Sequence, residues 1–130
     1  MSSILTGERL RVSVFGESHG PGIGAVADGL PAGEPVDLDA LARFMARRAP
    51  GGALSTARRE ADAVRVLSGL RDGVTTGAPL CTLIENTDAR SGDYRKLRDV
   101  PRPSHADYPA LLRYGGHADM AGVGHFSGRL

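Results

Sequence analysis

The chain reads RLRVSVFGESHGPGIGAVAD from Arg9 to Asp28. Polar and apolar residues alternate from Arg9 to Phe15, and this period predicts a half-buried β-strand. A glycine-rich loop follows from Gly16 to Gly24, and a second strand is expected over Ile23–Asp28. The loop therefore begins at an exposed strand end, where proteins commonly place binding and catalytic side chains.

Three chemically useful side chains stand between the flanking glycines of this loop: Glu17, Ser18 and His19. An unperturbed imidazole has a pKa of about 6.5, so His19 can give or take a proton at physiological pH. The alternative is a structural turn that simply exposes polar side chains.

The same residues also match G-x-S-x-G, the nucleophile elbow of the α/β-hydrolases. That elbow needs a helix directly after the serine, whereas Gly20-Pro21-Gly22 stands here, and it needs several strands before it. The loop also lacks the lysine of a P-loop and the glycine spacing of a dinucleotide-binding fold, which excludes both of those phosphate sites.

Helices and further strands alternate with loops in the rest of the chain. Asp37 or Asp39 can cap a helix that ends before Pro50. The apolar residues of this helix follow helical spacing: Leu38, Leu41, Phe44 and Met45. Further strands are expected over Val64–Leu67 and Pro79–Asn86, and a second helix over Asp107–Tyr114.

Composition and charge narrow the class of protein. The chain has 130 residues, enough for one domain at most, and a net charge of +1 gives no bulk attraction to nucleic acid or to a membrane surface. Cys81 is the single cysteine, which excludes an internal disulfide and agrees with a reducing cytoplasm; its apolar neighbours predict a buried thiol. No apolar run approaches the roughly 20 residues of a membrane span, and the N-terminus has no signal-peptide pattern.

Arginine dominates the basic residues, because Lys96 is the only lysine among 16. A codon bias of the host explains the excess as a whole, yet single arginines can still bind carboxylates or phosphates. Arg47-Arg48 at the end of the first helix, with Arg58-Arg59 further on, form either an anion site or a solvated helix end.

Two further segments could take part in a site. Arg102 could hold an anion and His105 could donate a proton just before the second helix; alternatively, Ser104 caps that helix and His105 packs locally. The glycine-rich segment around His125, Phe126 and Ser127 could wrap a phosphate with backbone N–H groups. His117 and His125 have no carboxylate or cysteine spaced to complete a metal site, so no metal is expected.

Taken in order, these segments resemble the chorismate synthase family along essentially the whole chain. The segments that carry the resemblance are Gly16–Gly20, Asp28–Gly33, Arg47–Gly51, Ser68-Gly69, Thr75–Pro79, Glu85–Asp88, Arg90–Tyr94, Arg102–Asp107 and Gly124–Arg129. The resemblance implies an α+β fold, part of a β-α-β sandwich in which antiparallel strands pack on helices. It also implies a cytoplasmic homotetramer that binds a small anionic substrate rather than nucleic acid or a membrane.

The family's reaction is the 1,4-anti elimination of phosphate from 5-enolpyruvylshikimate 3-phosphate, a lyase step of the shikimate pathway of aromatic amino acid biosynthesis. It needs reduced FMN although it involves no net redox change, and some members use NADPH as the reductant. The resemblance makes His19 and His105 the catalytic residues and Ser18, Arg48 and Arg102 the substrate-binding residues. It assigns FMN contacts to His125, Phe126 and Ser127, and an NADP contact to Arg48 in bifunctional members.

The sequence departs from the family pattern at several places. An arginine expected shortly after Pro50-Gly51 is replaced by Ala53 or Leu54, which weakens the expected substrate clamp. Ala121 and Val123 stand in a segment where the family has arginine and glycine, and Val123 would be strained if that position has a positive φ. The family's enzymes are well over twice as long, so residues 1–130 are expected to be an N-terminal portion whose remainder is absent. A catalytically inactive fragment that binds flavin or anions is the alternative function.

Overall fold

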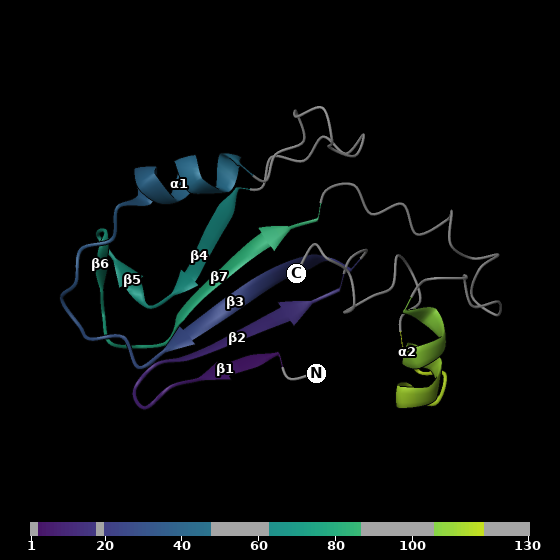
Figure 1. Cartoon of the computed structure of the whole chain (residues 1–130). Coiled ribbons are helices and arrows are strands. Elements are labelled where there is room, and N and C mark those ends of the chain that lie inside the picture. Colours follow the sequence, from purple (N-terminus) through teal and green to yellow (C-terminus); the bar gives the residue numbers. More distant parts are fainter. Residues whose placement is uncertain (1–2, 18–19, 48–62, 87–105, 119–130) are drawn as a thin grey trace. The chain divides into compact units, whose positions relative to one another are not determined.

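The structure is a computed structural model that describes residues 3–17, 20–47, 63–86 and 106–118 (Figure 1). The chain divides into two compact units. Residues 1–14 and 24–85 form the first unit, and residues 15–23 and 86–130 form the second.

A five-stranded antiparallel sheet organises the described residues. Its strands lie in the order β1-β2-β3-β7-β4 (Figure 1). They are β1 Ile4–Thr6, β2 Arg11–Gly16, β3 Gly22–Asp28, β7 Leu80–Glu85 and β4 Val64–Ser68. A separate two-stranded hairpin consists of β5 Leu70–Arg71 and β6 Val74–Thr75. Strand β3 therefore pairs with its sequence neighbour β2 on one side and with the distant β7 on the other.

The strands predicted from alternation and turn residues are confirmed with small shifts at their ends. Strand β2 begins two residues after the predicted Arg9, β3 and β4 each gain one residue, and β7 lies inside the predicted Pro79–Asn86. Strand β4 has a bulge between Val66 and Ser68, where it pairs with β7. Strands β1, β5 and β6 were not expected from the sequence.

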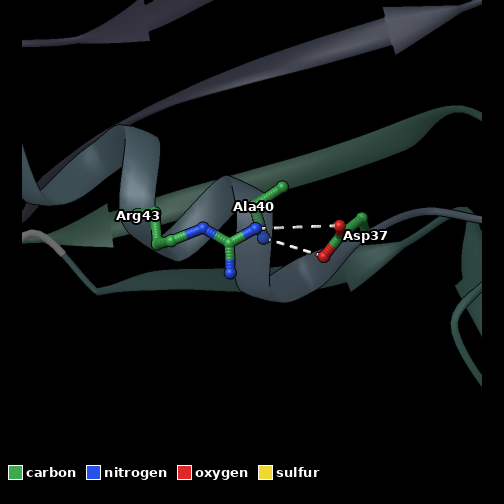
Figure 2. A network of polar contacts seen from close by, with 3 residues as sticks. All are labelled: Asp37, Ala40 and Arg43. Carbon is green, nitrogen blue, oxygen red and sulfur yellow. Dashed lines mark hydrogen bonds and ion pairs between the residues drawn. The ribbon is translucent and has the colours of Figure 1, made fainter.

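Helix α1, Leu38–Ala46, begins at Asp37, the first of the two caps that the sequence allowed. The Asp37 carboxylate accepts a hydrogen bond of 2.8 Å from the Ala40 backbone N–H, as Figure 2 shows. This bond satisfies one of the backbone donors that the first turn of a helix leaves open. Arg43 approaches the other Asp37 oxygen at 3.9 Å, but both side chains are about two-thirds exposed (71% and 67%).

Thr75 ties the predicted turn after β3 to the small hairpin. Its hydroxyl donates to the Pro31 carbonyl at 2.7 Å and accepts from the Glu34 N–H at 2.9 Å. Its backbone N–H donates to the Glu34 carbonyl and its carbonyl accepts from the Gly33 N–H, at 2.9 and 2.8 Å. Thr75 is buried and its two hydroxyl bonds are part-buried, and together the four hydrogen bonds hold this turn in place.

Helix α2, Asp107–Tyr114, lies in the second unit and has the predicted bounds. Its N-cap is Ala106, so the alternative in which Ser104 caps the helix is wrong. Gly115 ends the helix in the left-handed conformation, φ 58°, and its N–H donates to the Leu111 carbonyl. Asp107 and Ala110 are each only 1% exposed, which places the first turns of α2 against other atoms of the chain.

Few apolar side chains are buried among the described residues. Ile84 in the first unit and Ile23 and Ala110 in the second are the buried apolar residues among those described. Cys81 is half-buried, so the prediction of a buried thiol is wrong. Leu5 (72%), Leu112 (67%) and Phe44 (60%) are among the large apolar residues that face solvent. In the part of the chain that the structure describes, no helix is long and apolar enough to cross a membrane.

Candidate active site

Gly16 marks the point where β2 ends and the Gly16–Gly20 loop begins. Its φ is +111°, a conformation that residues with a Cβ rarely adopt. A Cβ built here would lie 2.5 Å from the Gly22 carbonyl oxygen and 2.7 Å from the Ile23 Cα. Backbone and space therefore both require glycine, which lets β2 turn tightly against the first residues of β3.

The other end of the loop is closed by a turn. The Gly20 N–H donates to the Glu17 carbonyl at 3.1 Å, the spacing of a β-turn over four residues. Glu17 and Gly20 are both half-buried. Ser18 and His19 are the two residues between them in the sequence, and they lie outside the described residues.

Asn86, the first residue after β7, contacts the same turn through two donors. Its backbone N–H donates to the Pro21 carbonyl at 2.9 Å. Its side-chain Nδ2 donates to the Gly20 carbonyl at 3.0 Å. The side chain is half-buried, and it joins residues 66 positions apart in the sequence. Sequence reasoning gave Asn86 no role; the two signals were its place at the end of the predicted strand Pro79–Asn86 and in the segment Glu85–Asp88 that resembles the family.

Strand β4 begins beside the end of β7, where Val64 pairs with Ile84. Arg65 and Glu85 form an ion pair of 2.8 Å there, with side chains 61% and 57% exposed. An exposed pair of this kind contributes little to stability, about 0–1 kcal/mol.

The residues predicted to form the site all lie outside the described part of the chain. They are Ser18, His19, Arg48, Arg102, His105, His125, Phe126 and Ser127. The same holds for Arg58 and Arg59 and for the departures at Ala53, Leu54, Ala121 and Val123. Their roles stay predictions, and what the structure adds is the framework on which the Gly16–Gly20 loop is built.

Cofactor and metal binding can be judged from the donor types. Within the described residues, no group of three or more His, Cys, Asp and Glu side chains could hold a metal ion. His117 is exposed. The residues predicted to contact FMN fit that group chemically, because an imidazole, a hydroxyl and glycine-rich backbone N–H groups all suit a phosphate ester, and Phe126 offers an apolar ring.

Comparison with known proteins places this framework in a family. Residues 10–130 match the family model described as chorismate synthase. The chorismate synthase of Aeropyrum pernix is 54% identical over 123 residues, which cover 95% of this chain and 32% of that protein. The chorismate synthase of Bordetella avium is 49% identical over 131 residues, covering 100% of this chain and 37% of that protein.

A solved structure shares the fold. A crystal structure of chorismate synthase superposes with a TM-score of 0.53 at 26% sequence identity, over 85% of this chain and 26% of that chain. The α+β class predicted for the chain, part of the chorismate synthase sandwich, is thereby confirmed. The chain spans about a third of the length of the curated relatives that it matches. It belongs to the chorismate synthase family.

Proposed function

We propose that this chain is the N-terminal portion of a chorismate synthase and carries part of its active site. The reaction is the elimination of phosphate from 5-enolpyruvylshikimate 3-phosphate to give chorismate, in the shikimate pathway of aromatic amino acid biosynthesis. Family membership over residues 10–130 supports this proposal. The observation that carries it to a site is the Gly16–Gly20 loop, where Gly16 packs closely against β3 at the entry and Asn86 donates a hydrogen bond to Gly20 at the exit.

The substrate's charge explains the arginines. It carries a phosphate and two carboxylates, and a guanidinium can bind such groups with two parallel hydrogen bonds. We assign this role to Arg48 and Arg102, with Ser18 as a further hydrogen-bond partner. The loss of a family arginine at Ala53 or Leu54 leaves the clamp weaker than in other members.

The two histidines move protons. In the elimination a C–O bond to phosphate breaks, a proton leaves the substrate carbon across the ring, and a C=C bond forms. We assign His19 to supply a proton or hydrogen bond to the departing phosphate, because imidazole holds or releases a proton near neutral pH. His105 acts as an acid toward the flavin.

Reduced FMN is the cofactor that this proposal requires, held by His125, Phe126 and Ser127. When bound, it supplies the electronic assistance to an elimination that leaves the flavin reduced overall. NADPH as reductant, with Arg48 as its contact, belongs to the bifunctional version of the proposal. A homotetramer in the cytoplasm completes the expectation for a family-length chain.

A catalytically inactive fragment that binds flavin or anions is the second candidate. It is favoured by the length of the chain, about a third of its curated relatives. It is also favoured by the small number of buried apolar residues in the described part of the chain.

The experiment is an anaerobic assay of the 130-residue chain with chemically reduced FMN and 5-enolpyruvylshikimate 3-phosphate, following phosphate and chorismate. The Aeropyrum pernix enzyme, a relative of family length, serves as the positive control. His117→Ala is the matched control variant, because His117 is exposed and has no assigned role.

Formation of both products, lost in His19→Ala and kept in His117→Ala, supports the catalytic proposal. No product from this chain, together with micromolar or tighter binding of reduced FMN, supports the inactive fragment. Turnover that His19→Ala leaves unchanged contradicts the role given to this loop.

A further inference from the structure

We propose that Asn86 is a positioning residue that fixes the exit of the Gly16–Gly20 loop and thereby the placement of His19. The contacts of Asn86 are seen in the structure, whereas their importance for catalysis rests on the function proposed above. Asn86 lies in the segment Glu85–Asp88, which resembles the family, but the resemblance gives this residue no role.

Asn86 donates hydrogen bonds to two consecutive carbonyls. Its backbone N–H donates to the Pro21 carbonyl at 2.9 Å, and its side-chain Nδ2 donates to the Gly20 carbonyl at 3.0 Å. The first bond continues the pairing of β7 with β3 beyond the last residue of the strand. The second reaches past the strands to the turn itself, and backbone pairing cannot supply it.

The side-chain type matters for this contact. An asparagine amide carries two N–H donors on a short side chain, whereas aspartate of the same shape carries only acceptors at neutral pH. Aspartate at position 86 would turn a hydrogen bond into an oxygen–oxygen repulsion at the Gly20 carbonyl. The contact is half-buried, so water replaces the missing donor only in part.

The two ends of the loop are then fixed by different means. Gly16 fits its entry against Gly22 and Ile23 by close packing, and Asn86 holds its exit through Gly20. The loop has only Glu17, Ser18 and His19 between these points, and His19 is bonded directly to Gly20. We therefore expect a shift of the Gly20 peptide to move His19, and a displacement of about 1 Å is enough to impair a catalytic group.

The chain offers a matched control on the same pair of strands. Thr82 in β7 donates its hydroxyl to the Ala25 carbonyl in β3 at 3.2 Å. Thr82→Val removes a side-chain-to-backbone hydrogen bond of the same kind from β7 to β3 and leaves the loop contacts intact. A general loosening of β7 against β3 would affect both variants alike.

The test is NMR spectroscopy of the 130-residue chain and its Asn86→Asp, Asn86→Ala and Thr82→Val variants. Asn86→Asp keeps the shape and the backbone bond to Pro21, so it reports on the Nδ2 contact even if Asn86→Ala unfolds. The first readout is the exchange rate of the Gly20 amide hydrogen, which is bonded to the Glu17 carbonyl. The second is the pair of imidazole signals of His19, with those of His117 as the internal reference.

In Asn86→Asp we expect Gly20 exchange to speed up by roughly tenfold, the scale of one lost hydrogen bond. We expect the His19 signals to move while those of His117 stay. Thr82→Val should change neither. Unchanged Gly20 exchange and unchanged His19 signals in a folded Asn86→Asp variant would overturn the inference, and so would equal changes in Thr82→Val.

This readout separates the inference from the proposed function. One outcome is that Asn86→Asp speeds Gly20 exchange and moves the His19 signals while His19→Ala leaves turnover unchanged. Asn86 then positions the loop, and the catalytic role proposed for the loop is wrong. If the chain is active, combining Asn86→Asp with His19→Ala tests whether the two residues act together. Alone, Asn86→Asp should lower kcat about tenfold with little change in KM. Added to His19→Ala, it should lower kcat no further.

Discussion

Gly16 and Gly33 allow the cost of a close approach to be separated from the cost of an unusual backbone angle. Both have positive φ, +111° and +88°. A Cβ on Gly33 would meet nothing within 4 Å, whereas one on Gly16 would run into the backbone of Gly22 and Ile23. Of these two glycines, Gly16 is the one that is required by space as well as by conformation.

We expect Gly33→Ala to lower the free energy of unfolding by about 1–2 kcal/mol, the cost of a left-handed backbone for a residue with a Cβ. Gly16→Ala should cost clearly more, by at least about 1 kcal/mol, because the backbone of β3 must also shift. Urea titrations of both variants measure the difference. Equal losses would show that the loop entry relaxes freely around the added methyl group.

Thr75 gives a second prediction at this scale, because its buried hydroxyl serves two backbone groups at once. Thr75→Val keeps the volume and leaves the Pro31 carbonyl and the Glu34 N–H without this partner. We expect a loss of about 1–3 kcal/mol in the free energy of unfolding. Ser68→Ala is the control: its hydroxyl donates to the Pro79 carbonyl at an exposed position, where water replaces it. A loss no greater than that of Ser68→Ala would contradict the anchoring role of Thr75.

Among the elements, helix α1 has no buried residue, so packing contributes little to its stability. The hydrogen bond at its N-cap is therefore expected to matter more. Asp37→Ala should lower stability by about 1 kcal/mol by removing the cap. Asp37→Asn should change the free energy of unfolding by only about a few tenths of a kcal/mol. Its amide oxygen still accepts from the Ala40 N–H, and the exposed 3.9 Å contact with Arg43 is largely screened by solvent. Chemical denaturation at low salt compares the two; a loss as large in Asp37→Asn would make the ion pair, not the cap, the stabilising contact.

Local sequence patterns predicted the elements that are long enough to show a period. The alternation before Gly16 predicted β2 to within two residues, and the helical spacing after Asp37 predicted α1. Strand β1 has three residues, and β5 and β6 have two each, too few for any period. The Asp72-Gly73 pair between β5 and β6, both at positive φ, is a hairpin signal that would have revealed them.

The framework of the site was predictable only in part, for the same reason. Gly16–Gly20 stands out because its residues are adjacent in sequence. The contact between Asn86 and Gly20 depends on β7 pairing beside β3, and no local pattern shows which of the later strands takes that place. The pairing of distant strands is decided by tertiary packing, which a single sequence does not display.

For the whole molecule, the small number of buried apolar residues has a consequence for cooperativity. Ile23, Ile84 and Ala110 are the buried apolar residues among those described, while Leu5, Phe44 and Leu112 are mostly exposed. A domain of ordinary size unfolds in urea with a slope of about 1–3 kcal/mol per molar, which scales with the surface buried on folding.

We expect this chain to unfold with a slope below that range and to bind the apolar dye ANS before it unfolds. The Aeropyrum pernix relative, measured alongside, should show a steep transition and weak dye binding. A steep single transition without dye binding in the 130-residue chain would show that its strands form a complete core on their own.

The distance along the chain between Gly20 and Asn86 also sets a delay during synthesis. The two residues are separated by 66 positions. Ribosomes add roughly 5–20 residues per second, so about 3–13 seconds pass between the emergence of the loop and that of the residue that holds it. Through this interval the hydrogen bond from Asn86 to Gly20 cannot form, so the loop reaches its final set of contacts only after β7 has been made.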